Sequence, residues 1–175
     1  MKTQVEAEVA AAGTSLRASD AVLAVLRRFW GFESLRPLQL EAIAAGLERR
    51  DSLVVMPTGG GKSLCYQVPP AVAGRTDVVV SPLIALMKDQ VDALRLSGYP
   101  AAAIHSGIDL AEVRQVEREL AAGHHHLIFV APERLLTPRF LELAARLNLP
   151  LATLDEKLKR AAESSGVGLF EARQK

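Results

Sequence analysis

Short apolar runs alternate with longer amphipathic stretches over most of this chain. The apolar runs are predicted strands, and they fall at Leu53–Met56, Val78–Ser81, Ala101–His105, Leu127–Val130 and Leu151–Leu154. All but Ala101–His105 are nearly continuous, as in strands that are covered on both faces. The helical stretches between them are Lys62–Gln67, Leu83–Leu96, Leu110–Ala121 and Pro138–Leu147. This alternation predicts an α/β fold with a mainly parallel sheet and helices on both faces.

The part of the chain before the first predicted strand is helical in pattern. Residues 1–18 are rich in alanine and lack sustained periodicity, so we expect a mobile N-terminal arm. Ser19 or Asp20 would cap a first helix that breaks at Gly31. Its apolar face would consist of Val22, Leu23, Val25, Leu26 and Phe29. A second helix is predicted at Pro37–Leu47, with proline in its first turn.

The segment after the first predicted strand has the residues of a phosphate-binding loop. Residues 56–67 read MPTGGGKSLCYQ, which fits the helicase-type pattern TGxGKS from Thr58 to Ser63. Gly59, Gly60 and Gly61 let the backbone approach phosphate oxygens. Lys62 would lie against the β and γ phosphates, and the Ser63 hydroxyl can ligate Mg²⁺. A glycine loop between a strand and a helix predicts a nucleoside triphosphate site.

Composition limits the class of protein that carries this site. The 175 residues suit one globular domain, and the longest apolar runs are too short to span a bilayer. We therefore expect a cytoplasmic protein without membrane contact. The single cysteine, Cys65, excludes an intrachain disulfide and is expected to be a small buried apolar residue. The net charge is only +1, so contacts to nucleic acid would depend on local geometry.

An acidic pair supplies the expected second half of an ATPase site. Asp155 and Glu156 directly follow the predicted strand Leu151–Leu154. Asp155 would hold Mg²⁺ directly or through water, and Glu156 would orient and deprotonate the attacking water. Together with Lys62, these residues form the candidate catalytic set.

The chain resembles the RecQ-type DNA helicases of superfamily 2 from about residue 20 to residue 156. Residues 26–39, LRRFWGFESLRPLQ, look like the family's motif 0, although Leu35 and Leu38 stand where phenylalanine and glycine are common. The resemblance implies that Phe32 and Arg36 sandwich adenine and that Gln39 hydrogen-bonds its edge. An aromatic face, a planar guanidinium and a carboxamide suit a purine. The resemblance thus implies a RecA-like P-loop NTPase lobe that uses ATP and Mg²⁺.

Two further segments resemble RecQ motifs that contact DNA. Residues 78–91, VVVSPLIALMKDQV, are similar to motif Ia, where DEAD-box proteins carry a PTRELA-like string. Residues 131–135, APERL, look like motif Ib. The resemblance implies contacts to the DNA backbone from Ser81, Pro82, Lys88, Pro132, Glu133 and Arg134. The run His124–His126 is expected to be a solvated turn rather than a metal site.

The resemblance stops after Glu156, and this divides the expected domains. We predict an arm at residues 1–18, a first RecA-like lobe at 19–156 that is truncated at motif II, and a non-family tail at 157–175. The lobe would be incomplete at its C-terminal end. The resulting hypothesis is the ATP-binding lobe of a RecQ-like 3′–5′ DNA helicase, a monomer that contacts DNA without unwinding it alone. Two alternatives stay open, a non-catalytic nucleotide- or nucleic-acid-binding module and a non-functional relic.

Overall fold

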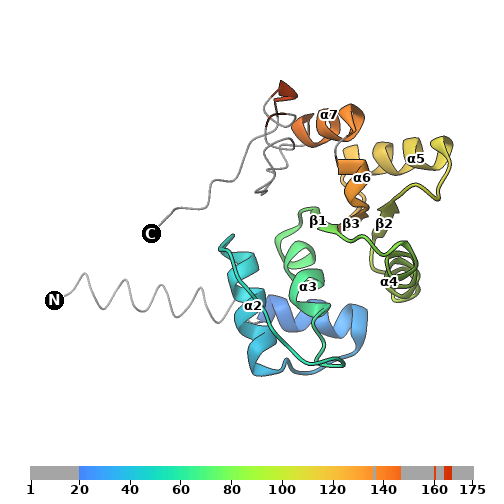
Figure 1. The fold of residues 1–175 in the computed structure, drawn as a ribbon. Coiled ribbons are helices and arrows are strands. Elements are labelled where there is room, and N and C mark those ends of the chain that lie inside the picture. The colour runs from blue at the N-terminus through green and yellow to red at the C-terminus, as the bar shows by residue number, and fades with distance from the viewer. Residues whose placement is uncertain (1–19, 136, 147–159, 161–163, 167–175) are drawn as a thin grey trace. The chain divides into compact units, whose positions relative to one another are not determined.

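The computed structural model describes residues 20–135, 137–146, 160 and 164–166 of the chain. The chain divides into two units, Met1–Arg75 and Thr76–Lys175, and each is described by itself. The first unit carries the glycine loop, and the second carries the sheet (Figure 1). No helix in these described ranges is long and apolar enough to cross a membrane.

Three helices form the core of the first unit. They span residues 20–30, α2 (Pro37–Leu47) and α3 (Leu64–Ala73). The first helix ends before Gly31, whose φ of 67° suits glycine, as predicted. The predicted capping residue Ser19 lies outside the described residues. The apolar faces of the three helices meet in a buried cluster of Val22, Leu26, Ile43, Leu64 and Val68.

Close packing between α2 and α3 depends on a small residue. A Cβ atom on Gly46 of α2 would lie 3.0 Å from Cγ of Pro69 in α3. Pro69 and Pro70 are both buried inside α3, so the helix continues well past the expected Lys62–Gln67. The sequence prediction ended this helix too early because proline normally interrupts a helix. Burial of the two rings compensates for the backbone hydrogen bonds that they remove.

The predicted strand Leu53–Met56 does not form, and the sequence prediction is wrong at this point. No described residue pairs with this segment in a ladder, and Leu53 and Val55 are 93% and 80% exposed. A strand is stabilised by a neighbour that satisfies its N–H and C=O groups, and apolar residues alone do not supply one. The segment instead lines one side of a hollow of 610 Å³, with Leu38, Ala42 and Ala45 of α2 on the other side.

The second unit contains a three-stranded parallel sheet. Its strands are β1 (Asp77–Val80), β2 (Ala101–Ile104) and β3 (Leu127–Val130), in the order β1-β3-β2. In register, Val80 and Ile104 both pair with Val130 of the central strand. These strands match three of the predictions, whereas the predicted strand Leu151–Leu154 lies outside the described residues. The helices of this unit are α4 (Ile84–Leu96), α5 (Leu110–Ala121), α6 (Pro132–Leu135) and α7 (Pro138–Arg146).

Helices cover both faces of this sheet, as the sequence predicts. Even-numbered strand residues, among them Ala102, Ile128 and Val130, pack with the apolar sides of α5 and α7 in one core. Successive residues of a strand point to opposite faces, so the odd-numbered residues face away from that core. On that side α4 packs against β2 and buries Met87, Val91 and Leu94. Figure 1 shows α4 on the opposite side of the sheet from α5 and α7.

The three consecutive histidines are not a solvated turn, which corrects the sequence prediction. His125 is 8% exposed, and its Nε2 lies 3.0 Å from Oε2 of Glu119 on α5. The ring of His126 makes an edge contact with Tyr99, and His124 is exposed. The run directly precedes β3, and burial increases from the exposed His124 to the two histidines next to the strand. Within the described ranges, no group of three metal-binding side chains could hold an ion.

We expect His125 to make the protein less stable as the pH falls. Burial lowers the pKa of His125 below its ordinary value of 6.5, and the contact with Glu119 compensates only in part. A second ring proton would also place an N–H on Nδ1, a buried atom with no hydrogen-bond partner among the described residues. The unfolded chain therefore binds the proton more readily, so the free energy of unfolding falls as the pH drops below 6.5.

Thermal unfolding followed by circular dichroism between pH 7.5 and pH 5 measures this effect. The variant His125→Gln, which cannot be protonated, should show a flatter pH dependence than the wild type. The variant His124→Gln is the matched control, because His124 is exposed, and it should behave as the wild type. Equal slopes for His125→Gln and the wild type would contradict the expectation.

Candidate functional site

The glycine loop between Met56 and α3 has the backbone shape that a phosphate cradle requires. Gly59 and Gly61 have φ values of 77° and 80°, which side chains rarely allow. A Cβ atom on Gly60 would lie 2.8 Å from the carbonyl oxygen of Pro57. Each of the three glycines is therefore needed, two for their backbone angle and one for space.

Hydrogen-bond donors gather at this loop. The backbone N–H groups of Gly61, Lys62 and Ser63 have no acceptor among the described residues. They precede the first turn of α3, where free N–H groups and the helix dipole favour an anion. The ammonium group of Lys62 is exposed and donates to the carbonyl oxygens of Met56 and Pro57, both at 3.0 Å. These donors fit the phosphates of a nucleotide.

Gln39, on α2, braces the glycine loop. Its Oε1 accepts a hydrogen bond from the backbone N–H of Arg36 at 2.9 Å. Its Nε2 donates to the carbonyl oxygen of Gly61 at 3.0 Å. The side chain is 4% exposed, and a Cβ atom on Gly61 would overlap its Nε2. The carboxamide thus links the start of α2 to the loop 22 residues further along the chain.

Arg36 makes a second link between these segments. Its guanidinium Nη1 donates to the carbonyl oxygen of Gly59 at 3.1 Å. Phe32 lies in the same connection between the first helix and α2, and the residue is 49% exposed. The structure therefore places Arg36 and Gln39 against the glycine loop and leaves Phe32, beside them in the chain, half exposed.

These links to the loop are a feature that sequence reasoning missed. A glutamine three residues after the start of a helix is one half of a capping box, and this signal was present in the order Arg36-Pro37-Leu38-Gln39. The usual serine or threonine partner is absent, which hid the pattern. The second hydrogen bond of Gln39, to Gly61, had no local signal because it crosses between distant segments.

The remaining predicted nucleotide-site residues are less constrained. Thr58 is exposed, and Ser63 is half-buried at the start of α3. Cys65 is also half-buried, and burial raises the pKa of its thiol, so it is not an activated nucleophile. Asp155 and Glu156 lie outside the described residues. Of the predicted Mg²⁺ ligands, the described part of the chain therefore contains Ser63.

The residues predicted to contact DNA follow the carboxyl ends of neighbouring strands in the second unit. The backbone N–H of Ser81 donates to Val130 at 3.2 Å, and that of Ala131 donates to Ile104 at 3.0 Å. These bonds align the ends of the three strands, so the loops after them lie along one edge of the sheet. Motif Ia leaves β1 at this edge and motif Ib leaves β3 there.

The side chains at this edge differ in how freely they can reach a ligand. Four of the predicted contacts, Pro82, Lys88, Pro132 and Glu133, are exposed. Ser81 is half-buried, and its Oγ accepts a hydrogen bond from the backbone N–H of Leu83 at 3.3 Å. Arg134 is half-buried and donates through Nη2 to the carbonyl oxygen of His105 at 3.3 Å. Arg134 therefore ties α6 to the end of β2, and Pro132 begins α6.

Known proteins show what this chain is similar to. Residues 36–157 match the DEAD/DEAH box helicase family. The chain is 42% identical over 134 residues to the ATP-dependent DNA helicase RecQ of Haemophilus influenzae, and 41% identical over 133 residues to that of Bacillus subtilis. The alignments cover 77% and 75% of this chain and 22% of either relative. The rat ATP-dependent DNA helicase Q1 is 41% identical over 119 residues, which cover 67% of this chain and 19% of the relative.

A solved structure is similar in fold. The crystal structure of the DUF1998 helicase MrfA bound to DNA superposes with a TM-score of 0.61 over 85% of this chain and 24% of that chain. At 20% sequence identity, this likeness supports the RecA-like α/β fold alone. The RecQ relatives agree with the motif Ia string, which predicted that branch rather than the DEAD-box proteins. Because the family match spans well over half of its residues, the chain belongs to the DEAD/DEAH box helicase family, with sequence relatives among the RecQ helicases.

Proposed function

We propose that this chain is the ATP-binding part of the first RecA-like lobe of a RecQ-like 3′–5′ DNA helicase. The observation that carries the proposal is the glycine loop, where three N–H groups have no acceptor in the described part of the chain and the Lys62 ammonium lies at the start of α3. The relatives named ATP-dependent DNA helicases support ATP as the nucleotide and DNA as the partner. The chain spans 22% of the length of these bacterial relatives, so the proposal concerns one part of such an enzyme.

The glycine loop would hold the triphosphate. The N–H groups of Gly61, Lys62 and Ser63 would donate to phosphate oxygens. Lys62 would exchange its two carbonyl acceptors for the β and γ phosphates, which is favourable because a charged acceptor forms the stronger hydrogen bond. Thr58, Gly59 and Gly60 shape the remainder of the cradle.

Motif 0 would recognise adenine, and this would require Gln39 to break a hydrogen bond that it makes within the protein. Phe32 would stack on the base, and Arg36 would cover its other face. The Gln39 carboxamide is hydrogen-bonded to Arg36 and Gly61. Pairing with the adenine edge therefore requires it to break at least one of these bonds. Binding of the base and support of the glycine loop would therefore be coupled through a single side chain.

The metal and the attacking water would depend mainly on residues that the structure does not describe. Ser63 and Asp155 would hold Mg²⁺, and Glu156 would orient and deprotonate the water. When bound, Mg²⁺ offsets negative charge on the β and γ phosphates.

DNA would lie along the carboxyl edge of the sheet in the second unit. Ser81 and Lys88 would approach backbone phosphates, and the Pro132-Glu133-Arg134 turn would line the same edge. Arg134 already bonds to His105, so we assign it to holding this edge in shape as well as to contact. For the 175 residues given, we propose ATP binding and DNA contact in a monomer, without strand separation.

A non-catalytic binding module is the second candidate, and one observation favours it. The segment before the glycine loop, Leu53–Met56, is unpaired and largely exposed. A loop whose leading segment is not held in a sheet can bind a nucleotide while failing to keep the geometry that hydrolysis needs. Binding without turnover would identify this module.

We expect Lys62→Ala to weaken ATP binding by about ten- to a hundredfold, because a hydrogen bond to a charged group contributes about 1.5–3 kcal/mol. Calorimetric titration of the 175-residue protein with ATP measures the affinity. Lys88→Ala is the matched control, since it removes the same charge from an exposed site on α4, and it should leave ATP affinity unchanged. Unaltered ATP affinity in Lys62→Ala would count against the proposed site.

The wild type and Lys62→Ala separate the two candidates when ATP turnover is measured with and without single-stranded DNA. Turnover that DNA stimulates and that Lys62→Ala abolishes would support the enzyme. ATP binding with no turnover in either condition would support the module.

We expect Gly61→Ala to lower the free energy of unfolding of the first unit by more than the strain of its positive φ alone would. A positive φ costs an alanine about 1–2 kcal/mol. The new Cβ also displaces Gln39, whose buried hydrogen bonds contribute about 1–3 kcal/mol when broken. Urea unfolding followed by the fluorescence of Trp30, the chain's single tryptophan, reports on this unit.

Two comparisons isolate the contact between Gly61 and Gln39. Gly31→Ala has a similar φ and nothing within 4 Å of the added Cβ, so it should cost the backbone contribution alone. In a Gln39→Ala background, Gly61→Ala should cost little more than Gly31→Ala. If Gly61→Ala lowers stability equally in the wild-type and Gln39→Ala backgrounds, Gln39 does not support the glycine loop through Gly61.

A further inference from the structure

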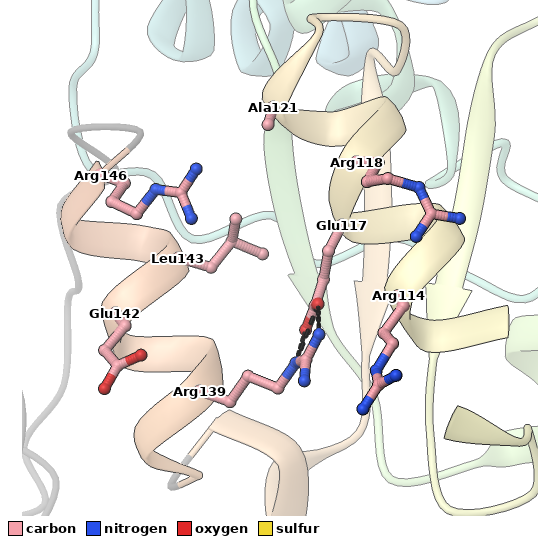
Figure 2. A pocket seen from close by; sticks show the side chains of 8 residues that line it. All are labelled: Arg114, Glu117, Arg118, Ala121, Arg139, Glu142, Leu143 and Arg146. Atoms are coloured by element: carbon pink, nitrogen blue, oxygen red, sulfur yellow. Dashed lines mark hydrogen bonds and ion pairs between the residues drawn. The ribbon is translucent and has the colours of Figure 1, made fainter. Parts of the chain in front are cut away.

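A groove between α5 and α7 has no role in the site described so far. It has a volume of 390 Å³ and is rich in arginine. Figure 2 shows its lining, which consists of Arg114, Glu117, Arg118, Ala121, Arg139, Glu142, Leu143 and Arg146. Four arginines and two glutamates leave this surface with a net positive charge, although the whole chain is nearly neutral.

One arginine of the groove is used to hold the two helices together. Nε of Arg139 on α7 donates to both carboxylate oxygens of Glu117 on α5, at 2.6 Å and 2.8 Å, and its Nη2 also bonds to Glu117. The Glu117 side chain is 15% exposed. This pairing neutralises the buried carboxylate and fixes the width of the groove.

The other cations keep their charge available. Arg114 and Arg146 are exposed and have no hydrogen-bond or ion-pair partner among the described residues. In Figure 2, Arg146 points from α7 toward α5, and Arg114 lies close to the Arg139–Glu117 pair. Arg118 bonds to the neutral side chain of Gln115, so its charge is not cancelled either. Glu142, the other carboxylate of the lining, has no hydrogen bond to an arginine of the described residues.

The groove begins beside the candidate DNA edge. α5 starts at Leu110, shortly after the carboxyl end of β2, and α7 follows α6 at the carboxyl end of β3. The N-terminal parts of both helices therefore lie near that edge, and they carry Arg114 and Arg139. From there the groove runs along the two helices to Arg146, about 10 Å further along α7 at 1.5 Å per residue.

We propose that the α5–α7 groove binds backbone phosphates of a DNA strand that continues from the carboxyl edge of the sheet, with Arg114 and Arg146 as the contacting residues. This inference rests on the proposed function. Guanidinium groups match phosphate geometry in two-pronged hydrogen bonds. We expect no base specificity from these contacts, because the backbone phosphates are the same at every nucleotide.

An acidic peptide is the competing ligand for such a surface. The apolar part of the lining is small, consisting of Ala121 and Leu143, and gives a peptide side chain little to bury. The start of both helices near the edge that carries Ser81 and Arg134 favours a nucleic-acid strand. We therefore assign the groove to phosphates.

The salt dependence of DNA binding tests the proposal. A fluorescein-labelled single-stranded oligonucleotide is titrated with the 175-residue protein at several NaCl concentrations. Each phosphate contact contributes about 0.7 to the slope of log K against log salt for single strands. The variant with Arg114→Gln and Arg146→Gln should bind more weakly, with a slope shallower by about 1.4.

Two control variants separate groove contacts from general charge. Arg28→Gln with Arg49→Gln changes the net charge equally in the first unit and should keep the wild-type slope, because both arginines lie outside the groove. Arg114→Lys with Arg146→Lys keeps the charge and should restore most of the slope. All four replaced side chains are exposed, so the variants should retain the wild-type circular dichroism spectrum.

The outcomes distinguish failure of the groove from failure of the proposed function. Wild-type DNA binding with an unchanged slope in the Arg114→Gln, Arg146→Gln variant overturns the groove and leaves the proposed function intact. If the same variant binds DNA as the wild type does but loses affinity for a glutamate-rich peptide, the groove is a peptide site and the proposed phosphate site is overturned. An absence of DNA binding by the wild type overturns the DNA part of the proposed function and the groove with it.

Discussion

Backbone hydrogen bonding is the constraint on which the arrangement of this molecule depends. β3 forms a sheet because it has a parallel neighbour on each side, and its register places Val80, Val130 and Ile104 side by side. That alignment brings the loops of motifs Ia and Ib to one edge. The equally apolar segment Leu53–Met56 forms no ladder with any described residue. Apolar composition makes a segment suitable for a strand, but paired N–H and C=O groups make it one.

The need to satisfy backbone hydrogen-bonding groups also explains the shape of the candidate nucleotide site. The glycine loop lacks a flanking strand that pairs with described residues, so its carbonyl groups are held by side chains instead. Arg36 binds the oxygen of Gly59, and Gln39 binds that of Gly61. Two residues that resemble adenine-binding positions are thus part of the support of the phosphate loop. Under the proposed function, binding of adenine would therefore be energetically linked to the shape of the glycine loop.

Arginines serve two different purposes in the second unit. Arg134 and Arg139 are tied to His105 and Glu117, and they fix the distances between neighbouring elements. Arg114 and Arg146 are left unpaired among the described residues on the wall of a groove. A chain with a net charge of +1 can therefore present a local positive surface without a basic composition.

The sequence by itself determined most of the described helices and strands, the glycine loop and the family. Local period, proline and glycine positions, and short motifs carry that information, and the predicted α2, α5 and β3 agree with the structure to the residue. Tertiary structure alone decided the burial of His125, the second bond of Gln39, the unpaired state of Leu53–Met56 and the meeting of arginines between α5 and α7. Each of these depends on contacts between segments distant in the chain, and the local pattern of residues does not record such contacts.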